Sequence, residues 1–246
     1  MQTAQALSDG PLFLDSGETA RVVEFGRGVD PAIHEQVLAL DAALNAAPPA
    51  GFRESVPTYR SLMVHYDPLR LSRADLVEVI HRALDAPKGE TRAPDRWIIP
   101  CCYDLPHGED VAEMAAKMGL SPEAALRHHQ AATYRIYMYG FAPGFTYLGG
   151  LHQEIAISRR EKPRPPHGAG AVLVGGGLAA IATFPMPTGW YVLGQTPERL
   201  YAPEREKAFL MEPGDEIRFE AIDAETYAAL AARAKTGEII ARKTAL

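Results

Sequence analysis

The densest signal for chemistry lies at residues 140–151, a segment crowded with glycine, proline and aromatic residues. Pro143 fixes one backbone φ angle, while Gly140 and Gly144 allow the positive φ values that other residues avoid. A strand that ends in such a loop can present backbone N–H groups to an anion, and the aromatic rings would frame the ligand. A rigid turn packed by its own aromatic residues explains the same pattern, so both interpretations stand.

A second candidate is the basic run at residues 159–164, which holds four Lys or Arg residues in six positions. It lies between the aromatic loop and residues 165–197, which contain no Asp, Glu, Lys or Arg. The planar guanidinium of arginine suits a carboxylate or a phosphate, so the run is either an anion site or a solvated basic face. Trp190, in a third segment at residues 187–197, would be a core residue or a pocket wall.

Familiar catalytic and cofactor motifs are missing from the sequence. It has no phosphate-binding loop, no complete dinucleotide fingerprint and no G-x-S-x-G elbow. The two cysteines, Cys101 and Cys102, are adjacent, which excludes a disulfide scaffold and a cysteine-based zinc site. The eight histidines are scattered without an H-x-x-x-H pair, so we predict no metal site.

Composition bounds the class of protein. Hydrophobic residues make up 47% of the 246 positions and charged residues 23%, as in soluble globular proteins. The net charge of -6 argues against a general nucleic-acid binder. Glycines and prolines interrupt the charge-free stretch, whereas a membrane helix needs roughly 20 continuous apolar residues. The first residues lack the basic and apolar regions of a secretory signal, so we expect a cytoplasmic protein that binds no membrane.

The elements that must position these segments fall into two groups, residues 1–95 and residues 96–246. In the first group, the pattern predicts a βαββαβ order, which is typical of a ferredoxin-like α+β domain. Strands are expected at 12–25, 52–59 and 61–66, helices after Asp30-Pro31 and after Ser72, and the last strand of the order at 97–99, just past the boundary. In the second group, helical segments at 109–131 precede short strands separated by Gly and Pro turns, and Asp223 caps a last helix. This pattern predicts a β-barrel or sandwich.

Taken together, these segments resemble the 5-oxoprolinase B-subunit family, also called the allophanate hydrolase subunit 1 family, which includes kinase-inhibitor proteins. The resemblance rests on five features: His129 five residues before Tyr134, the loop at 140–151, Pro163-Arg164 with Gly170, residues 188–197, and residues 213–219. This chain departs from the family pattern at residues 167–172, Leu178, Ala182-Thr183, Thr188 and Gln195. The resemblance implies a ferredoxin-like N-terminal domain followed by a cyclophilin-like β-barrel.

The resemblance also implies a function. Such proteins work with two partners, the 5-oxoprolinase A-subunit and the C-subunit, the latter also called allophanate hydrolase subunit 2. Together they hydrolyse 5-oxo-L-proline to L-glutamate at the expense of ATP. The ATP would be bound by this chain or by a partner, and the chain would be inactive alone. One alternative is the carboxyltransferase half of a biotin-dependent enzyme that acts on urea. The other is an inhibitor protein that docks on a sensor histidine kinase.

Roles for individual residues follow from the same resemblance. His129 is the predicted general base, and Arg135 and Arg164 would hold the anion, with Arg164 expected to be exposed. The predicted substrate-binding residues are Gly140, Phe141, Pro143, Gly144, Phe145, Tyr147, Trp190 and Gln195. The apolar pair Phe184 and Met186 is expected to contact a partner protein, or else to cap the barrel core.

Overall fold

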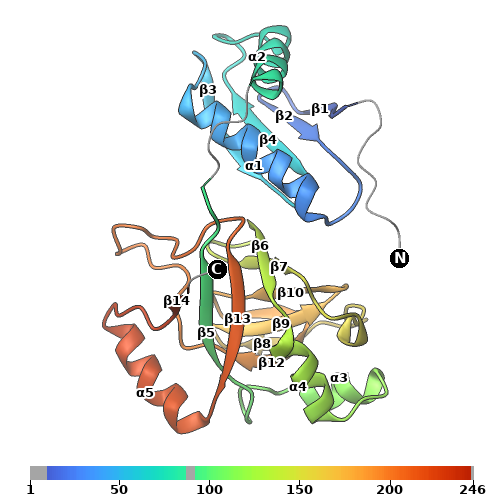
Figure 1. Ribbon diagram of the computed structural model, residues 1–246, viewed down its shortest axis with the longest axis vertical. Helices are drawn as coiled ribbons and strands as arrows, with labels where there is room; N and C mark the ends of the chain where they lie inside the picture. Colours follow the sequence, from blue (N-terminus) through green and yellow to red (C-terminus); the bar gives the residue numbers. More distant parts are fainter. Residues whose placement is uncertain (1–9, 87–91, 245–246) are drawn as a thin grey trace. The chain divides into compact units, whose positions relative to one another are not determined.

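The computed structural model describes residues 10–86 and 92–244 (Figure 1). The chain divides into two compact units, residues 1–93 and 94–246. The sequence predicted the boundary between residues 95 and 96, two residues after the boundary between the two units. Among the described residues, no helix has both the length and the apolar composition that a bilayer crossing requires.

The N-terminal unit is a four-stranded antiparallel sheet in the order β1-β2-β4-β3. Apolar residues of both helices pack with Val23, Leu62 and Val64 of the sheet in one core. The predicted helix starts are confirmed: Asp30 accepts the backbone N–H of Ala32 at 2.8 Å, and Ser72 accepts that of Asp75 at 3.1 Å. The elements are β1 (Leu12–Ser16), β2 (Ala20–Glu24), α1 (Pro31–Ala46), β3 (Phe52–Pro57), β4 (Ser61–Tyr66) and α2 (Arg73–Asp85).

The predicted βαββαβ order is wrong at both ends of this unit. The segment expected as one strand at 12–25 is a hairpin, because the chain turns at Gly17, whose φ is 67°. Its first strand, β1, supplies the outer position beside β2. The strand expected at 97–99 belongs to the second unit, where it pairs with strands far away in sequence. Hydrophobic alternation identifies a strand but does not identify its partner.

The second unit contains a closed β-barrel. Its strands follow the order β12-β9-β10-β7-β6-β13-β5, and the pairing of Gln195 with Cys102 joins β12 back to β5. A further strand, β14, extends the sheet beside β5, and β8 pairs with β11 separately. The strands are β5 (Arg96–Cys102), β6 (Tyr134–Tyr139), β7 (Thr146–Gly149), β8 (Arg164–His167), β9 (Ala171–Gly175), β10 (Leu178–Ile181), β11 (Met186–Thr188), β12 (Tyr191–Gln195), β13 (Glu216–Ile222) and β14 (Arg242–Thr244).

Four short helical segments accompany the barrel. They are α3 (Val111–Lys117), α4 (Pro122–Ala131), η1 (Gln153–Ile155) and α5 (Ala224–Lys235). As predicted, Ser121 caps α4 and Asp223 caps α5, each through its side-chain oxygen. Residues of α3 and α4, including Met114 and Ala125, join the main core cluster of the barrel. Both cysteines are buried free thiols on β5.

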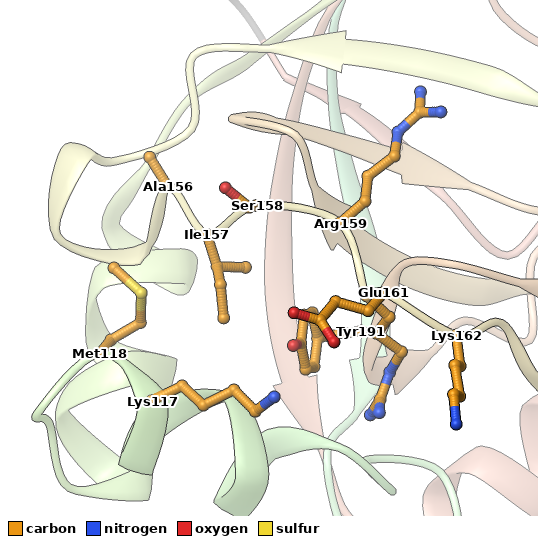
Figure 2. Close-up of a pocket in the computed structure, with 10 residues that line it drawn as sticks. Lys117, Met118, Ala156, Ile157, Ser158, Arg159, Glu161, Lys162 and Tyr191 are labelled. Carbon is orange, nitrogen blue, oxygen red and sulfur yellow. The ribbon is translucent and has the colours of Figure 1, made fainter.

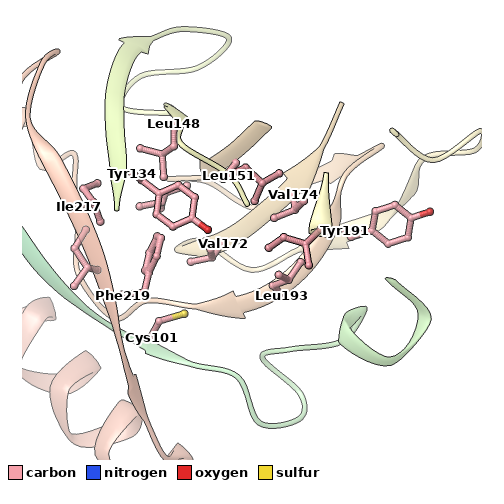
Figure 3. Packing of buried hydrophobic residues seen from close by; sticks show 14 of the residues in the cluster. Cys101, Tyr134, Leu148, Leu151, Val172, Val174, Tyr191, Leu193, Ile217 and Phe219 are labelled. Carbon is pink, nitrogen blue, oxygen red and sulfur yellow. The ribbon is translucent and has the colours of Figure 1, made fainter. Parts of the chain in front are cut away.

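The charge-free stretch is explained by packing on both faces of the barrel wall. On β9, Val172 and Val174 belong to the main core cluster (Figure 3), while Ala171 and Leu173 belong to a second cluster on the opposite face. A strand buried on both faces has no position for a charged side chain. Met186 packs against the second cluster, whereas Phe184 keeps 39% of its surface exposed.

Candidate functional site

The aromatic loop connects β6 to β7 and is held by its own hydrogen bonds. The backbone N–H of Gly140 donates to the carbonyl of Phe145 at 3.1 Å, and that of Phe145 donates to Ala142 at 3.0 Å. The N–H of Ala142 donates in turn to Gly140 at 2.7 Å. Three amides of the predicted anion-binding loop are therefore already bonded within it. Phe141, at the tip, has a φ of 67° and is 80% exposed.

The base of this loop is fixed against other segments. Gly144 has a φ of 73°, and a Cβ at this position would collide with the Cβ of Tyr201, so only glycine fits. The hydroxyl of Thr183 donates to the carbonyl of Pro143 at 2.7 Å. The loop is thus rigid, and its contacts place it against residues about 40 and 60 positions further along the chain.

An aromatic row leads from this loop to the basic run. The ring centroids of Phe145 and Tyr147 lie 4.9 Å apart, and those of Tyr147 and Trp190 lie 6.3 Å apart. The guanidinium carbon of Arg159 lies 5.3 Å from the centre of the Trp190 ring, a cation–π arrangement. Burial raises the pKa of the Tyr147 hydroxyl, and nearby Arg159 opposes that rise. Trp190 is buried in the second cluster, yet it also supports this arginine.

The basic run lines a cavity of about 760 Å³ (Figure 2). One side of the cavity is formed by the end of α3, and its floor includes the ring of Tyr191. Two cations lie near the Tyr191 ring, since the Arg160 guanidinium carbon is 4.3 Å and the Lys117 ammonium 5.7 Å from its centre. The lining residues are Lys117, Met118, Ala156, Ile157, Ser158, Arg159, Arg160, Glu161, Lys162 and Tyr191.

A nearly buried carboxylate, Asp110, organises the charges behind this cavity. One of its oxygens forms an ion pair with Arg160 at 2.8 Å, and the other accepts a hydrogen bond from Arg164 at 2.9 Å. The same carboxylate accepts the backbone N–H of Val192 at 2.8 Å, which ties the run to β12. Glu113 pairs with Arg160 at 2.6 Å, and this hydrogen bond lowers the pKa of Glu113.

The structure corrects the exposure predicted for Arg164. Its side chain is 13% exposed and forms ion pairs with Asp110 and with Glu109. An arginine that is neutralised by two carboxylates and largely buried is not an exposed anion holder. Its position indicates that it anchors the basic run to the segment that precedes α3.

The general-base role predicted for His129 is not supported either. The ring is fully buried beside Phe219 and Tyr134, and its Nδ1 lies 3.2 Å from the Tyr103 hydroxyl. Burial lowers the pKa of His129 to about 3. A ring closed off from solvent, with so low a pKa, is a poor acceptor of a substrate proton near neutral pH.

The remaining predicted residues do not meet in one place. Arg135 lies on β6, opposite Gly149 of β7 and Glu216 of β13. Gln195 lies at the far end of β12 from Trp190, where its side chain bonds to His107 Nδ1 at 2.6 Å and to the carbonyl of Ala169 at 2.5 Å. The predicted set is therefore divided among the aromatic row, the barrel core and the end of β12.

Three residues that shape the cavity were missed from the sequence. Asp110 and Lys117 lie about 50 residues before the basic run, and no spacing pattern links them to it. Tyr191 is adjacent to Trp190, so the aromatic pair was the signal that could have found it. Among the residues the structure describes, no cluster of three His, Cys, Asp or Glu side chains could hold a metal ion.

Comparisons with known proteins place the chain in a class. Residues 11–211 match the family described as carboxyltransferase domain, subdomain C and D. The B-subunit of 5-oxoprolinase from Bacillus subtilis (strain 168) is 32% identical over 222 residues, 86% of this chain and 92% of that protein. The protein of the same name from Escherichia coli O157:H7 is 32% identical over 205 residues, 82% of this chain and 92% of its own length.

Solved structures agree with this assignment. The structure of TTHA0988 matches with a TM-score of 0.75 and 38% identity. The match covers 83% of this chain but only 40% of the longer TTHA0988 chain. The structure of the K. lactis urea amidolyase matches with a TM-score of 0.76 over 95% of this chain and 16% of the amidolyase chain. The two sequences are 14% identical, so this match shows a shared fold alone. The chain is therefore a carboxyltransferase-domain protein. Within that class, it belongs to the 5-oxoprolinase B-subunit family.

Proposed function

We propose that this chain is one component of an ATP-dependent 5-oxoprolinase complex, which hydrolyses 5-oxo-L-proline to L-glutamate in the cytoplasm. The observation that carries the proposal is the alignment with proteins named as the B-subunit of 5-oxoprolinase over 92% of their length. Those names describe one component of an assembly. As the partners we propose an allophanate hydrolase subunit 2 (C-subunit) family protein and a 5-oxoprolinase A-subunit. Exposed Phe184 is a candidate contact with one of them.

The basic cavity and the aromatic row are the part of this chain that suits an anionic substrate. Arg159 lines the cavity, forms no ion pair with a carboxylate of the described residues, and can bind carboxylate or phosphate oxygens. ATP would supply activation of the lactam carbonyl; because the sequence carries no phosphate-binding loop, we propose that a partner binds it. We assign no nucleophile to this chain, so attack by water requires groups from a partner.

The proposal is tested by reconstitution. The chain is purified alone and also together with the proposed A-subunit and C-subunit partners, and glutamate release from 5-oxo-L-proline is measured with and without ATP. We expect release only from the full set of proteins and only with ATP. An assembled but inactive complex would refute the proposed reaction, and release by this chain alone would refute its dependence on partners.

The shared fold with urea amidolyase supports a second candidate, carboxyl transfer to urea. The same purified sets of proteins are therefore assayed with urea, bicarbonate, ATP and a biotin-carrying protein. Formation of a carboxylated urea product without glutamate release from 5-oxo-L-proline would favour this second candidate.

A further inference from the structure

We propose that Arg159 is the anchor for an oxyanion, the carboxylate or phosphate group of a small ligand that binds beside the Trp190 ring, at the rim of the basic cavity. The site itself stands on the geometry of this chain, and only the choice of ligands to test rests on the proposed function. Two features of the chain support the site: Arg159 has a positive charge that no carboxylate of the described residues neutralises, and the Trp190 ring holds its guanidinium in place.

The two acids behind the cavity, Asp110 and Glu113, already form ion pairs with other cations. Asp110 binds Arg160 and Arg164, and Glu113 binds Arg160 and Lys117. By contrast, Arg159 forms no ion pair with any carboxylate in residues 10–86 or 92–244. Its positive charge is therefore available to a ligand rather than used to hold the fold.

The aromatic row holds this available cation in a defined place. The Arg159 guanidinium lies over the Trp190 ring, 5.3 Å from its centre, and also interacts electrostatically with Tyr147. The contact with the ring uses no N–H group in a hydrogen bond to a carboxylate, so the N–H groups stay able to form a paired contact with two oxygens. An arginine held in this way loses less conformational freedom on binding than a mobile one.

Lys162 shows why an unpaired charge alone is insufficient. It lines the same cavity and also has no ion pair within the described part of the chain. No aromatic contact supports its ammonium, and in Figure 2 its side chain extends away from that of Arg159. We therefore expect Lys162 to stay solvated, which makes it the matched control. Glu161, the one acid among the lining residues, disfavours a second negative charge on the ligand.

The two tryptophans provide a readout that does not depend on catalysis. Trp190 contacts Arg159, whereas the Trp97 indole is buried and donates to Asp215 at 3.2 Å. In the nitrogen-15 spectrum of the full chain, each indole N–H gives its own signal. The chain is titrated separately with 5-oxo-L-proline, with inorganic phosphate and, at matched ionic strength, with sodium chloride. We expect either 5-oxo-L-proline or phosphate to shift the Trp190 signal saturably. The Trp97 signal should not move in any titration.

Variants then test the assignment to Arg159. We expect Arg159→Gln to raise the apparent Kd by about tenfold or more, because a charge-assisted hydrogen bond is lost. Lys162→Gln should change it by less than about twofold, and Arg159→Lys should give an intermediate value because it keeps the charge but not the paired contact. Equal increases in the apparent Kd of the Arg159→Gln and Lys162→Gln variants would show that only the net positive charge matters, which would overturn the proposal.

The ligands separate the two sources of the oxyanion. Saturation by 5-oxo-L-proline identifies a carboxylate, and saturation by phosphate identifies a phosphate group. Shifts that sodium chloride reproduces, or no shift with either ligand, would overturn the site. A saturable Trp190 response beside an inactive reconstituted complex would leave the oxyanion site standing and refute only the proposed reaction.

Discussion

Removal of the Asp110 carboxylate is the most direct test of how the basic run is held. In the Asp110→Ala variant, Arg160 and Arg164 each lose one of two carboxylate partners, and the backbone N–H of Val192 loses its acceptor. The side chain of Asp110 is only 10% exposed, so solvent cannot replace these bonds fully. Breaking a buried ion pair costs about 3–5 kcal/mol.

The magnitude expected here lies at the lower end of that range. Arg160 keeps Glu113 and Arg164 keeps Glu109, so neither guanidinium is left without a partner. The unsatisfied Val192 N–H adds to the loss. We therefore expect the free energy of unfolding of the barrel unit to fall by about 3 kcal/mol.

Urea denaturation followed by tryptophan fluorescence measures this loss selectively. Both tryptophans lie in residues 94–246, so the fluorescence reports the barrel unit. The control is Asp15→Ala in the other unit, where an exposed carboxylate pairs with Arg21 and Arg73. The fluorescence transition should not move in that variant. A loss below about 1 kcal/mol for Asp110→Ala, at an unchanged urea dependence, would refute the argument, since exposed pairs contribute that little.

Three further outcomes are expected. The folded state keeps His129 neutral, whereas the unfolded state protonates it near pH 6.5. Below pH 6.5, this group alone should therefore lower the free energy of unfolding of the wild type by up to about 1.4 kcal/mol per pH unit. Urea midpoints of His129→Phe between pH 7 and pH 4 should show a shallower slope, and parallel slopes would contradict the assignment. Glu198 is a buried carboxylate that accepts the backbone N–H of Ala241 at 2.7 Å. Glu198→Gln should speed hydrogen exchange of that amide by about tenfold or more. An unchanged exchange rate would show that this hydrogen bond does not protect the amide. Gly144→Ala should lower the melting temperature of the barrel unit far more than Gly17→Ala lowers that of the N-terminal unit. Both glycines have a positive φ, but of the two only Gly144 has a neighbour that a Cβ would meet. Equal losses would show that this close packing does not decide the effect.

Local elements of this protein were predictable from the sequence by itself. Asp30 and Ser72 cap their helices as expected, because a cap depends on neighbours within three residues. The alternation at residues 134–139 and the short apolar runs between glycines indicated strands of a barrel, and the structure contains them. The loop at 140–151 and the motifs around it also pointed to the family that the comparisons show.

Only the tertiary structure decided which segments meet. Strand β5 pairs with β13, more than 100 residues away, and Gln195 closes the barrel against Cys102. The same holds for the candidate site: Arg164 and Arg159 have the same residue type in one basic run, yet one is paired with carboxylates and the other lies on a tryptophan ring. Local sequence sets which groups can carry charge or form a strand. Burial and long-range pairing set which charges are neutralised, because desolvation makes each buried charge depend on a partner.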